Sequence, residues 1–410
     1  MKKKLMPFIS LRYHDFRLLL FAIFISQLGI QMEMVTINWH IYVLTHSPIY
    51  LGLIGLAGFL PVLVFSLLSG TLADRFDRKL LYTLSLSLTS IAAGVLAVTT
   101  FLHVVSPAVL YSMVIITAVA ATLGIPSRQS IAPALIPKEH FLNAMSMSNM
   151  VWQATVILGP MAGGFLIAFY GVQSVYTLNF LACIIASLVL LFMHVPKKEE
   201  REVTNISLGA MKEGIQFVIK TPIIYSTMLV DFFATFFASA SVLMPIFARD
   251  ILRVGPQGVG LLYAAPAIGA LLSGLLLSLF HNPKHQGRVL LGAVVVYGMA
   301  IVGFGFSRIF LLSLFFLGLS GAGDMVSAVI RNTVRQMKTP DYLRGRMTAI
   351  NMNFFMGGPY LGDLEAGITA HWWGAPGSVI VGGIGTIVFT LLVALVVPKL
   401  REYTADQLAV

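Results

Sequence analysis

The feature that most constrains this chain is a run of residues, Phe141–Met193, that contains no charged side chain. A helix needs about 20 apolar residues to cross the hydrocarbon core of a bilayer, so this run is long enough for two crossings. Similar uncharged runs recur along the whole sequence, and only 11% of its residues are charged. A soluble globular protein carries about 25% charged residues. We therefore expect an all-α polytopic membrane protein rather than a water-soluble enzyme.

The uncharged runs predict twelve transmembrane helices in two sets of six. The long run divides at Gly171-Val172-Gln173, where we expect a short turn. The predicted domains are residues 1–195, a cytoplasmic linker with an amphipathic segment at 196–221, residues 222–398, and a cytoplasmic tail at 399–410. The other predicted spans are Leu18–Val43, Ile49–Ala73, Leu80–Leu102, Val104–Pro126, Ile223–Ala248, Gly258–Phe280, Val289–Ser307, Ile309–Val334, Met347–Ala370 and Pro376–Val397.

The positions of the basic residues predict the orientation of these spans. Of the 27 Lys and Arg residues, all but Arg249, Arg253 and Arg308 fall on the side that also holds both termini. Cytoplasmic loops carry the excess of Lys and Arg, so both termini are expected in the cytoplasm of a bacterium, with the protein in its inner membrane. The net charge of +10 then faces anionic lipid, and no nucleic-acid partner is expected.

Landmarks of the first half recur in the second half in the same order. Bundles repeated in this way are the architecture of secondary transporters that rock about a site near the bilayer midplane. We therefore expect two pseudo-symmetric six-helix bundles and transport by alternating access. The matching landmarks are Leu67-Leu68-Ser69-Gly70 with Leu271-Leu272-Ser273-Gly274, Arg128 and Pro137 with Arg331 and Pro340, and Gly159-Pro160 with Gly358-Pro359.

The loop between the second and third spans reads Gly70-Thr71-Leu72-Ala73-Asp74-Arg75-Phe76-Asp77-Arg78-Lys79. Taken alone, it is a charged hairpin that anchors the cytoplasmic side. Its first glycine permits close helix contact, and a helix N-terminus or an arginine could hold Asp74. The run resembles the signature loop of the major facilitator superfamily, with Asp77 where that motif usually has a second glycine. The resemblance implies that Asp74 latches the two bundles together, with Arg75 and Arg78 as partners.

The fifth span carries Gly159-Pro160-Met161-Ala162-Gly163-Gly164, which resembles the antiporter-associated motif of the same superfamily. Pro160 removes a backbone hydrogen bond and the glycines permit close packing, so ordinary helix packing is the alternative interpretation. Gln27, Phe59-Leu60-Pro61 and Pro126-Ser127-Arg128-Gln129 add a resemblance to the branch that holds enterobactin exporters and macrolide efflux pumps. The mid-membrane arginine that many proton antiporters carry in the fourth helix is missing from this sequence.

Ionisable residues inside the predicted spans are the candidate sites, because a charge in the hydrocarbon costs about 2.5–3.5 kcal/mol on insertion scales and tends to be functional. In the superfamily, helices 1, 4, 7 and 10 chiefly line the cavity. A carboxylate there could take up a proton on one side of the membrane and release it on the other. The candidates for proton coupling or substrate binding are Glu33, Asn38, His40, Asp231, Asp324, Arg331, Asp363 and Glu365.

Several candidates also have a structural interpretation. Asp324 can pair with Arg331 one to two turns along the same helix, and Glu33 can pack against His40 or a neighbouring helix. Asp231 lies near mid-depth, where a purely structural role is harder to support. Asp363 and Glu365 are about 200° apart around their helix, so they cannot both face one cavity.

These observations predict a secondary active transporter that exports a siderophore-like amphipathic molecule in exchange for protons. The open alternatives are a multidrug or macrolide efflux pump, an importer of a siderophore or another nutrient, and a non-pumping lipid scramblase or sensor. We expect a monomer whose partners are its solute, protons and membrane lipids. There is no phosphate-binding glycine loop, and a single cysteine, Cys183, excludes a disulfide or multi-cysteine metal site. No catalytic residue, cofactor or bound metal is expected.

Overall fold

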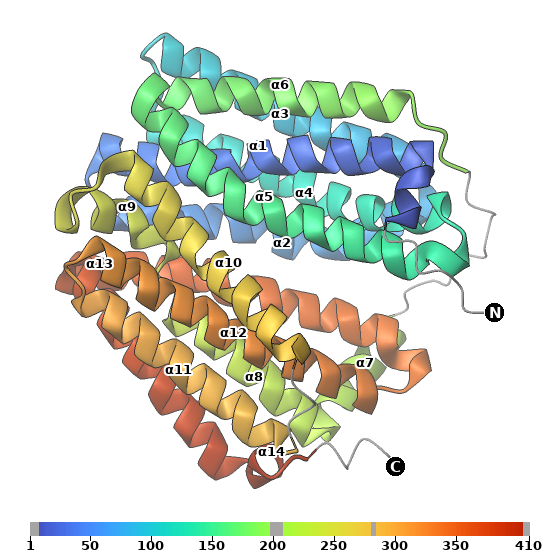
Figure 1. Cartoon of the computed structure of the whole chain (residues 1–410), viewed down its shortest axis with the longest axis vertical. Helices are drawn as coiled ribbons and strands as arrows, with labels where there is room; N and C mark the ends of the chain where they lie inside the picture. Colours follow the sequence, from blue (N-terminus) through green and yellow to red (C-terminus); the bar gives the residue numbers. More distant parts are fainter. Residues whose placement is uncertain (1–7, 197–207, 280–283, 405–410) are drawn as a thin grey trace. The chain divides into compact units, whose positions relative to one another are not determined.

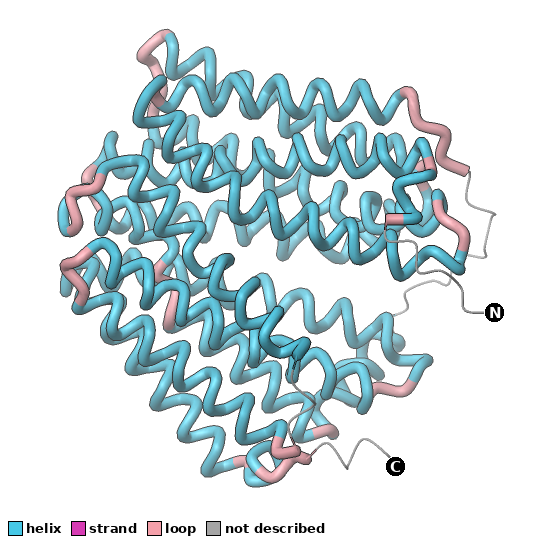
Figure 2. Tube along the Cα trace, viewed as in Figure 1, coloured by secondary structure: helices cyan, strands magenta, loops and turns pink. Residues whose placement is uncertain are grey.

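The computed structural model describes residues 8–196, 208–279 and 284–404. Within these ranges, the side chains of residues 66–75, 208–212, 341, 345–346, 348–349 and 353 lie outside the description. All regular secondary structure in the described ranges is helical, as Figure 2 shows. Eleven helices there are long and apolar enough to cross a membrane, and the last of these covers 47 residues, enough for two crossings. The predicted all-α polytopic fold is confirmed.

The chain forms two compact units, residues 1–40 with 60–204 and residues 41–59 with 205–410. In the first unit, α3 packs against both α4 and α6. Gly171 has a φ of 79°, which ends one helix and starts the next, so the predicted turn is confirmed. The helices that form this unit, with α1 and α2 extending into the second, are η1 Ile9–Arg12, α1 His14–Thr45, α2 Pro48–Arg75, α3 Arg78–Phe101, α4 Pro107–Leu135, η2 Lys138–His140, α5 Phe141–Tyr170 and α6 Val172–Leu191.

Two side chains at the junction of α2 and α3 form hydrogen bonds with helix ends. The Asp77 carboxylate accepts hydrogen bonds from the backbone N–H groups of Lys79 and Leu80, at 2.7 and 3.0 Å, and so caps α3. Its φ of −59° is open to any residue, which explains why no glycine is needed at this position. The Lys79 ammonium donates to the carbonyls of Leu191 and Met193 at the end of α6.

In the second unit, α11 packs against both α12 and α13, and α8 lies along α13 (Figure 1). The amphipathic segment predicted within the linker is helix α7, whose Val218 packs against Ile224, Met228 and Met347; linker residues 197–207 lie outside the described ranges. The elements are α7 Leu208–Lys220, α8 Pro222–Phe237, η3 Ser241–Leu243, α9 Met244–Ile246, the π-helical turn η4 Phe247–Ile251, α10 Gly255–Leu279, α11 Gln286–Phe306, α12 Phe310–Lys338, η5 Asp341–Leu343, α13 Arg344–Val396 and α14 Pro398–Arg401.

One predicted helix in this unit needs correction. Ile223–Ala248 is wrong as one continuous helix, because α8 ends at Phe237 and the chain then continues as short helical pieces to Ile251. Residues 238–240 are not helical, and Ser239 and Ser241 bond to Asp363 of α13 instead. The eleventh and twelfth predicted spans are both present within α13, which is divided by a kink at Gly374, where φ is 73°.

The glycine–proline elements of the two halves make equivalent contacts, which supports the predicted pseudo-symmetry. A Cβ on Gly163 of α5 would lie 3.1 Å from the Cα of Met32 in α1. A Cβ on Gly362 of α13 would lie 2.5 Å from the carbonyl oxygen of Phe236 in α8. In each unit, therefore, the absent side chain lets two helix backbones approach closely.

The start of the predicted tail packs onto the second unit. Leu400 and Tyr403 are buried in a cluster that includes Leu290 of α11 and Val334 of α12. The Gly287 N–H donates to the Tyr403 carbonyl at 3.1 Å, and a Cβ on Gly287 would lie only 1.7 Å from the Leu400 carbonyl oxygen. The chain from Pro398 to Tyr403 is thus part of the folded unit.

Candidate functional site

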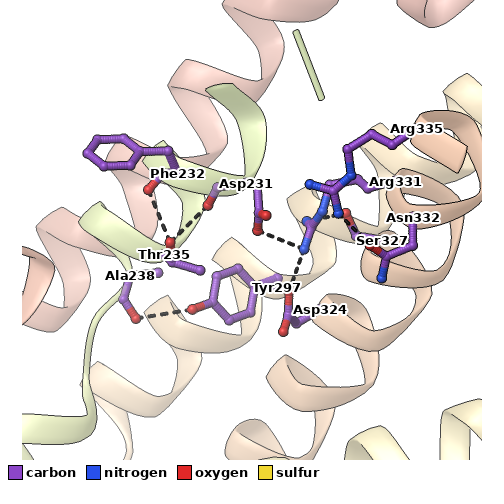
Figure 3. Close-up of polar contacts among 10 residues, drawn as sticks. All are labelled: Asp231, Phe232, Thr235, Ala238, Tyr297, Asp324, Ser327, Arg331, Asn332 and Arg335. Carbon is purple, nitrogen blue, oxygen red and sulfur yellow. Dashed lines mark hydrogen bonds and ion pairs between the residues drawn. The ribbon is translucent and has the colours of Figure 1, made fainter. Parts of the chain in front are cut away.

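Three charged side chains of the second unit meet between α8 and α12, and we call Asp231, Asp324 and Arg331 the charge network (Figure 3). One guanidinium nitrogen, Nη2 of Arg331, lies 2.8 Å from Oδ1 of Asp231 and 3.3 Å from Oδ1 of Asp324. The side chains of Asp231 and Arg331 are almost completely buried, whereas that of Asp324 is 49% exposed. Arg331 therefore forms ion pairs with both a buried carboxylate and a half-exposed one.

The sequence of α12 places its share of the charge network on one helical stripe. Asp324, Ser327 and Arg331 are separated by three and four residues, so their side chains lie on the same face. Ser327 accepts a hydrogen bond from Nη1 of Arg331 at 2.7 Å, which fixes the guanidinium plane. The pairing of Asp324 with Arg331, which is the structural interpretation of Asp324, is present. The contact of Arg331 with Asp231 joins two candidates that the sequence placed in separate helices.

A second arginine lies one turn further along α12. Arg335 is buried and donates to the side-chain oxygen of Asn332 in its own helix. Its charge acts on Asp231 as well as on Arg331. Two carboxylates and two guanidinium groups thus balance one another in and around the charge network. Burying charges is costly unless they are paired, and the ion pairs of Arg331 with Asp231 and Asp324 supply that pairing.

The charge network can change its protonation state without losing all its pairing. If Asp231 takes up a proton, Arg331 keeps Asp324 and Ser327 as acceptors. The local charge then rises by one unit, and the acceptor at Asp231 is weakened. A buried carboxylate is suited to proton exchange when a second carboxylate can keep its arginine partner paired.

The charge network is also linked to the break in the seventh span. The Thr235 hydroxyl, one turn after Asp231, donates to the Asp231 carbonyl at 2.9 Å. Tyr297 of α11 donates through its hydroxyl to the carbonyl of Ala238, where α8 has ended (Figure 3). That bond satisfies a carbonyl that the interrupted helix leaves without its usual partner.

The candidates of the first unit lie against α6. Glu33 is 4% exposed, and its carboxylate accepts a hydrogen bond from the Asn179 amide at 2.7 Å. His40 Nδ1 lies 3.1 Å from the Tyr176 hydroxyl, so Glu33 and His40 each contact a different α6 side chain. Asn38 is buried and donates to the Met34 carbonyl of its own helix. The packing of Glu33 against a neighbouring helix matches its structural interpretation.

Asp363 and Glu365 face different surroundings, as their spacing predicts. The Asp363 carboxylate accepts hydrogen bonds from the hydroxyls of Ser239 and Ser241, at 2.5 and 2.9 Å. Glu365 accepts a hydrogen bond at 2.7 Å from Thr369, one turn further along α13. Of these two acids, therefore, Asp363 is the one that is bonded to the seventh span.

The residues of the two sequence motifs are placed as follows. The side chains of Asp74 and Arg75, and the surroundings of Gly70, lie outside the described residues. Arg78 donates to the Ser130 carbonyl of α4 at 2.9 Å. In α5 the motif residues Gly159, Pro160, Gly163 and Gly164 are all buried. Their gating role stays a prediction.

Sequence reasoning missed the partners of the candidate acids. Asn179 and Tyr176 are polar residues three apart in a transmembrane helix, and that spacing was an available signal. Ser239 and Ser241 gave no such signal, because they lie in a run that looked like one continuous span. Among the described residues, no group of three or more His, Cys, Asp and Glu side chains is placed to hold a metal ion.

The sequence is similar to proteins with a transport function. Over residues 5–409 it matches the family described as transmembrane secretion effectors. The enterobactin exporters of Citrobacter koseri and Salmonella typhi are each 29% identical over 95% of this chain and 93% of their own length.

Solved structures share the fold at low sequence identity. The nucleoside transporter NupG has a TM-score of 0.73 at 13% identity, covering 95% of this chain and 100% of its own. A bacterial homologue of the human lysosomal transporter Spinster has a TM-score of 0.74 at 15% identity, covering 96% and 99%. The protein is therefore a multi-pass membrane transporter rather than an enzyme, and it takes a small-molecule substrate. The chain belongs to the transmembrane secretion effectors of the major facilitator superfamily.

Proposed function

We propose that this protein exports a siderophore-like amphipathic molecule across the bacterial inner membrane in exchange for protons. The observation that carries the proposal is the charge network, in which a buried Asp231 shares Arg331 with the half-exposed Asp324. The similarity to enterobactin exporters over 95% of the chain supports the solute class and the outward direction. Alternating access of the two bundles would carry the solute across.

Exchange follows if the proton and the solute compete for the same carboxylate. Ionised Asp231 can accept hydrogen bonds from hydroxyl groups of a solute, and hydrogen bonds to a charged acceptor are the stronger ones. Protonation weakens that acceptor, while Asp324 keeps Arg331 paired. A proton arriving from outside would therefore displace the solute, and the solute would displace the proton on the inside.

The surroundings of the transporter are part of the proposal. The excess of Lys and Arg on the side of the termini supports a cytoplasmic location for both ends. The same residues would contact anionic lipid headgroups. We propose that each monomer transports on its own, since each chain holds both bundles.

The test is gradient-driven transport of enterobactin in proteoliposomes, comparing the wild-type protein with Asp231→Asn. We expect the variant to lose at least about tenfold in gradient-driven flux, because it cannot exchange a proton at that position. It should still fold, because Arg331 retains Asp324 and Ser327. Glu402→Gln is the control, since Glu402 is an exposed carboxylate outside the charge network.

Two outcomes would contradict the proposal. Unchanged gradient-driven flux in Asp231→Asn would remove this residue from proton coupling. Equilibration of the solute by the wild-type protein at the same rate with and without a pH gradient would indicate a passive protein, such as a scramblase.

A further inference from the structure

The break in the seventh span is bonded to α13 through the side chain of Asp363. Both serines next to the break, Ser239 and Ser241, donate to the same oxygen of its carboxylate, at 2.5 and 2.9 Å. The neighbouring Gly362 allows this approach, since a Cβ there would lie 2.9 Å from the Cβ of Ser239. Two serine hydroxyls at the break are thus bonded to a side chain of another helix.

The chain beyond the break is held at its other end as well. We call residues 241–251 the gate segment. Its Asp250 accepts a hydrogen bond from the hydroxyl of Tyr42, and the Arg249 guanidinium lies 6.0 Å from the centre of the Tyr42 ring. Tyr42 is near the end of α1, in the stretch 41–59 that packs within the second unit. The gate segment is therefore a short, separately attached piece of the seventh span.

Residues 41–59 also reach Asp363 directly. A Cβ on Gly55 of α2 would lie 2.8 Å from the Cβ of Asp363 and 2.4 Å from the carbonyl oxygen of Tyr360. A Cβ on Gly52 would lie 3.0 Å from the Cα of Gly367. Asp363 consequently lies where α2, α13 and the gate segment converge.

The described groups around Asp363 are serine hydroxyls, phenols and a glycine. The seventh span contributes two serine hydroxyls, and α2 contributes a glycine. The phenols of Tyr360 and Tyr297 are within electrostatic reach, and phenols ordinarily ionise near pH 10. Glu365 is bonded to Thr369 instead. Asp363 forms no ion pair among the described residues, so no cation fixes its charge.

We propose that the protonation state of Asp363 controls how firmly the gate segment is bonded to α13. When ionised, its carboxylate holds Ser239 and Ser241 and keeps the gate segment against α13; when protonated, it holds them weakly and the segment can swing about residues 238–240. Hydrogen bonds to a charged acceptor are stronger than those to a neutral one, so a single proton weakens both bonds. The proposal goes beyond the proposed export function, because it depends neither on the solute nor on the direction of transport.

The test measures how accessible the break is at different pH values. Cys183, the single cysteine, is replaced by alanine, and Ala240, which is buried at the break, is replaced by cysteine. Maleimide labelling is followed in lipid nanodiscs, where the reagent reaches both faces. The rate is divided by that of a His103→Cys reference at the same pH, because His103 is exposed in the loop after α3 and this removes the intrinsic pH dependence of thiol reactivity.

We expect the normalised rate to rise about tenfold once the pH is low enough to protonate Asp363, because the two bonds to its carboxylate then weaken. Asp363→Asn still accepts hydrogen bonds but cannot ionise, so it should show one rate at all pH values, close to that of the parent at low pH. Glu365→Gln, two residues away and facing Thr369, should follow the parent. The Ser239→Ala, Ser241→Ala double variant should label quickly throughout.

The same experiment can overturn the proposal. A pH-dependent rise that persists in Asp363→Asn would show that another group controls the gate segment. A parent protein whose rate does not change with pH would show that protonation of Asp363 does not release it. Neither result depends on transport, so failure here is distinguishable from failure of the export proposal.

Discussion

Buried acids in this protein are paired with specific polar side chains. Glu33 meets the Asn179 amide, and the other end of that amide accepts a weak hydrogen bond from the thiol of Cys183 at 3.5 Å. Gly29 makes room for this contact, since a Cβ there would lie 2.3 Å from the Asn179 side-chain oxygen. A polar group buried without a partner is costly, so each such pair constrains how its two helices pack.

Asn179→Leu should destabilise the first unit by about 1–3 kcal/mol, because Glu33 would remain buried without its donor. Replacing both partners by apolar residues is often close to neutral, so Glu33→Leu combined with Asn179→Leu should recover much of the loss. Thermal unfolding in detergent measures both changes. Thr177→Leu, on the exposed face of the same helix, is the control. Equal destabilisation by the single and double variants would contradict a direct pairing.

Among the candidate acids, the sequence was sufficient to find the positions but not their partners. A charge within an apolar run is visible in one dimension, which is why Glu33, Asp231 and Asp363 were identified. The partner depends on which faces of two helices meet, and Arg331 illustrates this. Its pairing with Asp324 follows from helical spacing, whereas its pairing with Asp231 requires the packing of α8 against α12.

At the scale of elements, the positions of the helices can be predicted from hydrophobicity, whereas the positions of their interruptions cannot. Uncharged length located the spans, and the glycine at 171 located a turn. The break after Phe237 was missed because residues 223–248 contain only one charge and no internal glycine. What stabilises the break is Asp363, more than a hundred residues later. A contact at such a distance along the chain leaves no local pattern.

The glycines of the two glycine–proline elements give a prediction for helix packing. Gly163→Ala and Gly362→Ala should each destabilise the protein by about 1–3 kcal/mol, because the new methyl group has to displace backbone atoms of α1 or α8. Gly318→Ala is the control, since its Cβ would lie 3.7 Å from the nearest atom, an ordinary contact. Apparent melting temperatures in detergent provide the comparison. Similar melting temperatures for all three variants would contradict close backbone packing at the two motif positions.

The C-terminal segment gives a second prediction at this scale. Gly287→Leu should detach residues 398–403 from α11, because any Cβ at this position overlaps the Leu400 carbonyl. Carboxypeptidase digestion should then proceed past Tyr403, which is buried in the wild-type protein. Gly292→Leu, five residues further along α11, has open space around it and should leave the digestion pattern unchanged. Resistance of Gly287→Leu to digestion would show that the segment is held in another way.

For the whole molecule, the repeated sequence produces two halves with similar packing, but their functional groups differ. Gly159 and Gly358 occupy matching positions and perform matching packing, so the symmetry of the fold could be predicted. The functional groups do not repeat in the same manner. The second unit holds the Asp231–Arg331–Asp324 charge network, while the first unit pairs Glu33 with a neutral amide. The list of intramembrane charges already placed all but Glu33 in the second half, but it did not show how they pair.

The central claim is that solute and proton compete at Asp231, and proton release on binding tests it most directly. Purified protein in weakly buffered detergent is titrated with enterobactin while the pH is recorded. The account predicts release of up to about one proton per bound solute in the wild-type protein, because linkage requires the solute to favour the ionised form, and none in Asp231→Asn. Solute binding without proton release in the wild-type protein, or equal release in both proteins, would contradict it.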